Sequence, residues 1–213
     1  MLLCPSMMCA DFGALREETQ ALDAAGVDIF HCDIMDGTFV PNITMGLMDV
    51  RAIRAATNKP IDCHLMVENP SQKIDLVADA GADIIYIHPE SERYMVKTLA
   101  AIRDKGLKAG LVINPDTSVH TIQEMLNFAD YVMVMTVNPG FAGQQFIEFT
   151  TEKIKTLASL KERYGFVLTI DGACSPERIE RLHALGADGF VLGTSALFGH
   201  GPYTEALAKL RAL

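Results

Sequence analysis

Eight short apolar runs recur along the chain, and stretches with helical periodicity separate them. The runs fall near residues 2–7, 29–35, 61–67, 84–88, 109–113, 131–135, 166–170 and 189–193. Apolar residues at helical spacing are clearest in 12–25, 92–105, 146–164, 176–185 and 203–212. Short apolar runs bounded by Gly or Pro are typical of buried strands, and longer periodic stretches are typical of amphipathic helices. The pattern therefore predicts strands that alternate with helices.

One sequence pattern marks four junctions between a helical stretch and the next apolar run. In each, the helix ends near a small residue, an Asp follows, and the apolar run begins. Gly favours the left-handed conformation that ends a helix, and Asp favours the tight turn into a strand. Four copies indicate repeated βαβ units and a parallel sheet. They are Ala25–Phe30, Ala80–Ile85, Phe128–Val132 and Leu185–Phe190.

The number of units and the chain length predict the fold class. Eight strands with eight helical segments in 213 residues fit a compact α/β protein of the (β/α)8 TIM-barrel type. No Pro/Ser-rich linker divides the chain, so residues 1–213 are expected to form a single catalytic domain. An open doubly wound sheet is the alternative, although that fold usually needs fewer units.

Composition and charge exclude several classes of protein. Hydrophobic residues make up 49% of the chain, which is enough for a large core. No apolar run reaches the roughly 18 residues of a membrane span. The net charge of −9 argues against a nucleic-acid surface, and an anionic ligand would need a local positive field. Five cysteines without a CxxC pair, and an N-terminus without a basic region, predict a cytoplasmic protein without disulfides.

Histidines and aspartates stand at the ends of three apolar runs. They are His31, Asp33, His64 and Asp171. Imidazole and carboxylate groups are ligands of divalent metals such as Zn²⁺, Fe²⁺, Mn²⁺ or Co²⁺. If the runs are parallel strands of one barrel, all four side chains face the same mouth, where barrel enzymes work. Buried polar residues satisfied by the backbone are the alternative, but each uncompensated buried carboxylate would be costly.

Two of these carboxylates can also perform acid–base chemistry. Asp33 follows the second strand and Asp171 the seventh, so they are expected on opposite sides of the barrel. One carboxylate can then remove a proton from one face of a carbon while the other returns a proton to the opposite face. This arrangement suits inversion of a stereocentre next to a carbonyl, with the metal stabilising the enediolate oxygens.

Several residues near these strand ends are candidates for substrate contacts or for support. Met35, Met66 and Met135 are interpreted as an apolar floor under the reacting carbons, with ordinary core packing as the alternative. The loop Asn138–Gln144 and the segment Gly193–Ala196 contain no Lys or Arg, so phosphate binding there would depend on backbone N–H groups. Near the barrel, His88, Glu90, Asp36, Asp62 and Asn114 are interpreted as structural or supporting, whereas His120, His183 and His200 are expected at the surface.

Longer motifs resemble those of the ribulose-phosphate 3-epimerases and their close relatives, over nearly the whole chain. The matching pieces are Pro5-Ser6, His31–Gly37, Phe39–Asn42, His64–Val67, Met135–Phe146 and Asp171-Gly172. The resemblance implies one divalent metal (Zn, Fe, Mn, Co or Mg) on His31, Asp33, His64 and Asp171, with Asp33 and Asp171 as the acid–base pair. It implies a small-molecule ketose phosphate as the substrate and a homo-oligomer, dimer or hexamer. It also implies substrate contacts from Ser6, His64, Gly140, Phe141, Ala142, Gly143, Gly172, Ala173, Thr194 and Ser195.

Small departures resemble the branch of D-allulose-6-phosphate 3-epimerases. Ala173 stands where the pentulose enzymes usually carry a second Gly, and Thr194 lies in a segment that differs from their usual Gly-Ser-Ala. The resemblance therefore favours D-allulose 6-phosphate, converted to D-fructose 6-phosphate, over D-ribulose 5-phosphate of the pentose phosphate pathway. The chemistry at C3 is the same for both.

Two other functions are weaker alternatives. Phosphate-binding barrel lyases and decarboxylases centre on an Asp-x-Lys-x-x-Asp strand, but the corresponding run here is Asp62–Met66 and contains no Lys. A non-catalytic barrel that senses a sugar phosphate has no need of an acid–base pair. Retention of both Asp33 and Asp171 therefore favours an enzyme.

Overall fold

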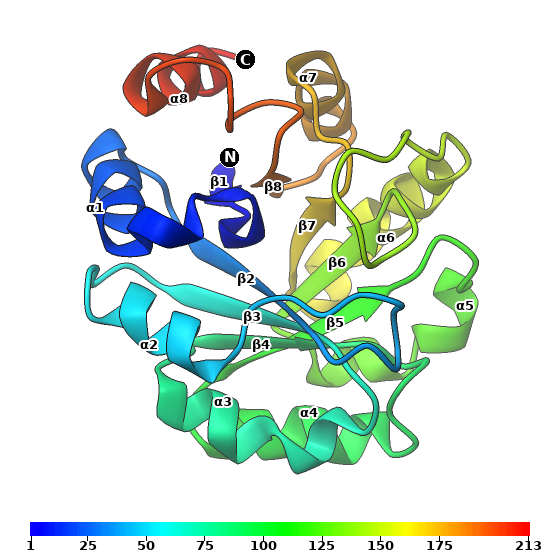
Figure 1. The fold of residues 1–213 in the computed structure, drawn as a ribbon. Coiled ribbons are helices and arrows are strands. Elements are labelled where there is room, and N and C mark those ends of the chain that lie inside the picture. Colours follow the sequence, from blue (N-terminus) through cyan, green and yellow to red (C-terminus); the bar gives the residue numbers. More distant parts are fainter.

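All eight predicted strands form one parallel sheet that curls into a barrel (Figure 1). The computed structural model describes all 213 residues. The strands follow one another in the order β1-β8-β7-β6-β5-β4-β3-β2. A parallel bridge between Ser6 and His31 brings β1 to β2 and completes the circuit. The (β/α)8 prediction is thus confirmed. The strands are β1 Leu2–Pro5, β2 Phe30–Met35, β3 Ile61–Met66, β4 Ile84–Ile87, β5 Lys108–Ile113, β6 Tyr131–Met135, β7 Val167–Asp171 and β8 Gly189–Leu192.

Eight helices lie around the outside of the strands (Figure 1). None of them is both long and apolar enough to cross a membrane. The helix predicted over 146–164 begins only at Thr150, because Phe146 and its neighbours lead into it as a loop in which the Ile147 N–H donates to the Thr136 carbonyl at 2.8 Å. The helices are α1 Leu15–Ala25, α2 Leu47–Arg54, α3 Ile74–Ala80, α4 Met95–Asp104, α5 Val119–Ile122, α6 Thr150–Tyr164, α7 Pro176–Ala184 and α8 Tyr203–Arg211.

Side chains along each strand alternate between two cores, as the pleat of a strand dictates. Outward residues such as Cys32 and Cys63 pack in the large cluster between the sheet and the helices. Inward residues fill the barrel, where the buried Tyr86 hydroxyl lies 3.1 Å from Thr169 Oγ1. The Tyr86 ring lies against Gly110, at which a Cβ would come within 2.3 Å of the ring. The barrel is therefore packed below its mouth.

The aspartates of the four repeated junctions connect neighbouring strands. Each was predicted to serve its own turn, but its side chain also accepts a backbone N–H from the start of the preceding strand. Each also lies beside a Lys or Arg. The pairs are Asp28 with Arg211, Asp83 with Arg54, Asp130 with Arg103 and Asp188 with Lys161. The bonds are Leu3 to Asp28 (2.7 Å), Ile61 to Asp83 (2.8 Å), Ala109 to Asp130 (2.9 Å) and Leu168 to Asp188 (2.8 Å). We call these four residues the junction aspartates.

Candidate active site

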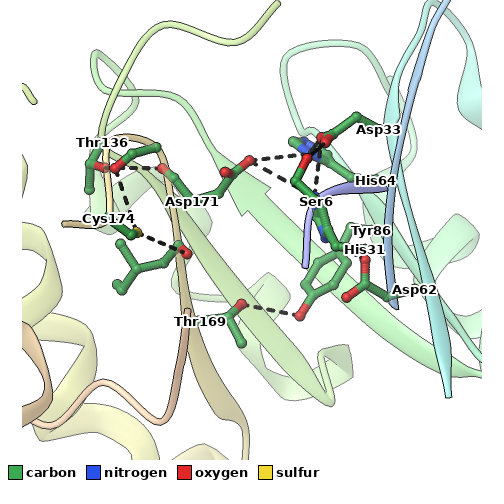
Figure 2. A network of polar contacts seen from close by, with 12 residues as sticks. Ser6, His31, Asp33, Asp62, His64, Tyr86, Thr136, Thr169, Asp171 and Cys174 are labelled. Carbon is green, nitrogen blue, oxygen red and sulfur yellow. Dashed lines mark hydrogen bonds and ion pairs between the residues drawn. The ribbon is translucent and has the colours of Figure 1, made fainter. Parts of the chain in front are cut away.

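The four predicted ligands meet at the mouth of the barrel (Figure 2). Strand β2 carries His31 and Asp33, β3 carries His64, and Asp171 ends β7. One ligand atom from each residue lies within 4.8 Å of all the others. Both imidazoles are fully buried, and Asp171 is the most exposed member. The alternation of side chains along strands β2 and β3 produces this convergence, as the sequence predicted.

The spacing of the donor atoms fits a divalent metal. Asp33 Oδ1 lies 3.1 Å from His31 Nε2 and 3.2 Å from His64 Nδ1. Asp171 Oδ2 lies 3.6 Å from His64 Nδ1 and 4.0 Å from His31 Nε2. Four ligands at about 2.0–2.1 Å around a tetrahedral ion would be separated by about 3.3 Å. Asp33 and the two histidines are already close to this separation, and Asp171 would have to move inward for the four residues to hold such an ion.

The second nitrogen of each histidine has its own buried partner. His31 Nδ1 lies 2.5 Å from Asp62 Oδ1, and the two residues are opposite one another in the register of β2 and β3. His64 Nε2 lies 2.7 Å from His88 Nε2, and His88 Nδ1 lies 3.4 Å from Glu90 Oε2. Sequence reasoning interpreted Asp62, His88 and Glu90 only as structural or supporting. The available signal was position, because Asp62 shares a strand face with His64, and His88 follows β4.

The two carboxylates of the cluster have opposite pKa shifts. Burial, with the nearby charge of Asp33, raises the pKa of Asp171 to about 6. Burial also acts to raise the pKa of Asp33, but the charges of His31 and His64 and their hydrogen bonds outweigh it and hold that pKa well below its usual value. Two carboxyl groups whose environments separate their pKa values can act as acid and base at one pH.

The predicted substrate-binding residues line one cavity beside this cluster. Ser6 Oγ donates to Asp33 Oδ2 at 2.7 Å and orients that carboxylate. His64, which the resemblance also implied as a substrate contact, is not part of the cavity lining, and neither is His31. The structure adds Met8, Cys9 and Val137, which the sequence did not indicate. The predicted residues that line the cavity are Ser6, Asp33, Met35, Met66, Met135, Gly140, Phe141, Ala142, Gly143, Asp171, Gly172, Ala173, Thr194 and Ser195.

One end of the cavity presents backbone N–H groups in place of cationic side chains. No Lys or Arg lines the cavity. The N–H groups of Gly172, Ala173, Thr194 and Ser195 donate to no other backbone group. The carbonyls at the start of the same loop are occupied, since Thr136 Oγ1 donates to Gly172 and Arg178 Nη1 donates to Ala173. N–H donors without a backbone acceptor, beside carbonyls that are already occupied, form a surface suited to an oxyanion such as phosphate.

Ala173 has an unusual backbone conformation in this loop. Its φ of 48° lies in the left-handed region, which an alanine adopts at a cost, and Gly172 beside it has a φ of 111°. A Cβ on Gly172 would come within 2.7 Å of Val137 Cγ2, so only glycine fits there. The loop is thus built around one required glycine and one alanine in a conformation that glycine favours.

Solved structures of other barrels share this fold at low sequence identity. A 3-hexulose-6-phosphate synthase superposes with a TM-score of 0.71 at 18% identity and covers 100% of this chain and 99% of that one. A phosphoribosyl anthranilate isomerase from Thermus thermophilus superposes with a TM-score of 0.67 at 15% identity and covers 100% and 96%. At this identity the likeness concerns the fold alone.

Sequence comparison identifies the family. A ribulose-phosphate 3-epimerase from Aquifex aeolicus is 42% identical over 214 residues, covering 100% of this chain and 96% of that protein. The enzyme of the same name from Bacillus subtilis is 39% identical and covers 98% and 97%. The profile described as Ribulose-phosphate 3 epimerase family matches residues 2–198. The chain is therefore an isomerase of the epimerase class and belongs to the ribulose-phosphate 3-epimerase family.

Proposed function

We propose that this chain inverts the configuration at C3 of a ketose phosphate, and that D-ribulose 5-phosphate is its substrate. The observation that carries the proposal is the pair Asp33 and Asp171, which approach one buried site from different strands with pKa values shifted in opposite directions. The relatives that match at 39–42% identity over almost the whole chain carry the name ribulose-phosphate 3-epimerase. This supports the pentulose over the hexulose that the sequence motifs favoured.

The proposed mechanism transfers protons on the two faces of C3. Strands β2 and β7 are separated by β1 and β8, so the two carboxylates reach the mouth from different directions. In one direction of reaction the ionised Asp33 removes the C3 proton, and the protonated Asp171 delivers a proton to the other face; in the reverse direction the roles exchange. Ser6 holds the Asp33 carboxylate in place through its 2.7 Å hydrogen bond.

A divalent metal and a phosphate have separate places in this proposal. His31, Asp33, His64 and Asp171 would hold the metal, which when bound supplies Lewis-acid stabilisation of negative charge on the substrate oxygens. The N–H groups of Gly172, Ala173, Thr194 and Ser195, which have no backbone acceptor, would bind the phosphate, as would the loop Gly140–Gly143. Met35, Met66 and Met135 form the apolar floor between these two regions. One divalent metal ion (Zn, Fe, Mn, Co or Mg), a homo-oligomeric state and a cytoplasmic location are further predictions.

D-Allulose 6-phosphate is the second candidate substrate, and one observation favours it. Ala173 keeps its methyl group at a left-handed position on the cavity wall, where glycine would remove the backbone strain. A residue kept at such a cost is expected to contribute to substrate fit.

The test of the substrate is kcat/KM for C3 epimerisation, measured for D-ribulose 5-phosphate and for D-allulose 6-phosphate on one metal-reconstituted preparation. A preference for the pentulose supports the proposal, and a preference for the hexulose replaces it with the second candidate. Activity on neither compound contradicts both proposals and favours a sugar-phosphate-binding barrel.

The matched variant is Ala173→Gly, which relieves the backbone strain while leaving the donor N–H in place. If Ala173 selects the substrate, the ratio of the two kcat/KM values changes in this variant; an unchanged ratio excludes that role.

A further inference from the structure

The two buried histidines of the cluster are supported in different ways. The nitrogen of His31 that faces away from the site meets a carboxylate directly, at 2.5 Å from Asp62. The corresponding nitrogen of His64 meets a second imidazole, at 2.7 Å from His88 Nε2. His88 is itself fully buried, and its ring meets that of His64 edge to edge, with ring centroids 5.0 Å apart and an interplanar angle of 23°. A buried chain of two imidazoles therefore leads away from one ligand and not from the other.

The short contact between the two imidazoles admits a single proton. Two ring nitrogens 2.7 Å apart form one hydrogen bond, in which one donates and the other accepts. His64 Nδ1 faces the metal cluster and must offer a lone pair to hold a metal, so its proton must lie on Nε2. His88 Nε2 is then the acceptor, and His88 carries its own proton on Nδ1, which faces Glu90 Oε2 at 3.4 Å.

Glu90 is fixed from its other side. Its Oε1 atom accepts the backbone N–H of Asn114 at 3.1 Å and the hydroxyl of Thr117. Lys153 Nζ, from α6, donates to the carbonyl of Asn114 at 3.0 Å and to that of Thr117, which anchors the same loop. The carboxylate therefore has a set position, in which its Oε2 atom is the acceptor nearest to the His88 Nδ1 proton, at 3.4 Å. The N–H groups of His64 and His88 therefore point in the same direction, away from the metal cluster and toward Glu90.

We propose that His88 and Glu90 are positioning residues that hold His64 in the tautomer with its proton on Nε2, and so keep the Nδ1 lone pair directed at the metal. The inference rests on the proposed function in so far as that function requires a metal on His64. It assigns to β4 and the loop after it a share of the metal affinity, although neither contributes a ligand. Partners of this kind typically change metal affinity about 10–100-fold when they are removed.

Metal affinity of matched variants tests this inference. Zn²⁺ affinity is measured by competition with a chromophoric chelator for the wild type, His88→Leu, His88→Gln and Tyr86→Phe. His88→Leu removes the acceptor and is expected to weaken Zn²⁺ binding about 10–100-fold. His88→Gln can accept from His64 through its oxygen and donate to Glu90 through its amide, so it should stay within a few fold of the wild type. Tyr86→Phe, which removes a buried hydroxyl two residues before His88, should leave the affinity unchanged.

A second measurement needs no variant and reads the tautomers directly. Long-range ¹H–¹⁵N correlation on the Zn²⁺-loaded wild type should show the His64 proton on Nε2 and the His88 proton on Nδ1. A His88 proton on Nε2 would overturn the inference, as would a folded His88→Leu protein that binds Zn²⁺ as tightly as the wild type. If instead the wild type binds no divalent cation while epimerising its substrate, the metal part of the proposed function fails as well, so the two failures are distinguishable.

Discussion

The junction aspartates lie at the N-terminal ends of the strands, and each has a backbone donor and a cation beside it. Asp33 and Asp171 lie at the C-terminal ends, where they share a buried cluster with two histidines. The junction aspartates lie at a partly exposed surface, where ionised carboxylates keep part of their hydration. Asp33 and Asp171 have little water around them, and burial together with the charges of their neighbours shifts the pKa of both carboxyl groups. Aspartate side chains thus have fixed hydrogen-bond and charge partners at one end of the barrel, and shifted pKa values at the other.

This difference separates stability from reactivity along the barrel axis. A carboxylate that accepts a fixed backbone donor lowers the free energy of the folded state. A buried carboxylate near a second one has a raised pKa, which costs stability but prepares it for proton transfer. In barrel enzymes the catalytic face is the C-terminal one, and the opposite face can be optimised for stability. The expected effects of substitution follow this division.

The largest expected effect is on activity, at the C-terminal end. Asp33→Asn and Asp171→Asn each remove one proton-transfer group, and kcat for epimerisation should fall about 10²–10⁴-fold in either variant. Because each variant retains the other carboxylate, it should still exchange the C3 proton of one epimer with D₂O, and the two variants should act on opposite epimers. Epimerisation rates and ¹H NMR exchange are the measurements. Wild-type turnover in either variant would exclude the two-carboxylate mechanism.

The next effect is on stability, at the N-terminal end. In Asp188→Ala the Leu168 N–H loses its acceptor, so the free energy of unfolding should fall by about 1–3 kcal/mol, while kcat stays at the wild-type value. Urea unfolding and steady-state kinetics measure the two quantities on one preparation. Since Asp188 and the reacting cluster lie at opposite ends of β7 and β8, a large fall in kcat without unfolding would contradict the separation of the two ends.

Both ends of this comparison show what the sequence can and cannot predict. Strand positions were predicted within two residues, because short apolar runs and Gly or Pro boundaries are local signals. Asp33 and Asp171 were predicted as site residues because strand ends of a barrel share a face. The junction aspartates were recognised as a repeat but assigned to their own turns, because the N–H groups that they accept belong to other strands. The short helices α2, α3 and α5 have too few turns for a clear periodicity.

The contact between His64 and His88 was also beyond the sequence. A histidine near a strand end is ordinarily satisfied by the backbone, and only the packing of β3 against β4 shows which ring nitrogen meets which partner. The same holds for Asp62, whose place opposite His31 depends on the register of two strands. Local patterns therefore predicted that His31, Asp33, His64 and Asp171 lie together, and only tertiary packing shows which side chains lie behind them.

A smaller effect connects pH to the stability of the metal-free protein. The pKa of Asp171 is about 6 in the folded state and about 4 in an unfolded chain, so the folded state binds the proton more strongly. Stability from this group is present at low pH and is lost as the pH rises from about 4 through about 6. Thermal unfolding of the metal-free protein should show this loss, and Asp171→Asn, which cannot ionise, should not.

A metal ion should reverse that loss, because it takes the place of the proton among the carboxylates. The rise in melting temperature on adding Mn²⁺ is therefore expected to be larger at pH 7 than at pH 5. Equal shifts at the two pH values would show that Asp171 does not compete between proton and metal. The comparison uses one buffer series of constant ionic strength, so that screening at the exposed junction aspartates stays the same.

The smallest effect concerns the cation beside a junction aspartate. Lys161 Nζ lies 2.5 Å from Asp188 Oδ1 and also donates to the Gly186 carbonyl at 2.9 Å. Both side chains are partly exposed, so water and salt screen the ion pair, and Lys161→Met should lower the free energy of unfolding by less than about 1 kcal/mol. The loss of stability in Lys161→Met, measured by urea unfolding, should shrink further at high salt. The loss in Asp188→Ala should persist, because the backbone N–H of Leu168 loses its acceptor at any ionic strength. Equal losses in the two variants would mean that the junction aspartates act through their ion pairs and not through the neighbouring strand.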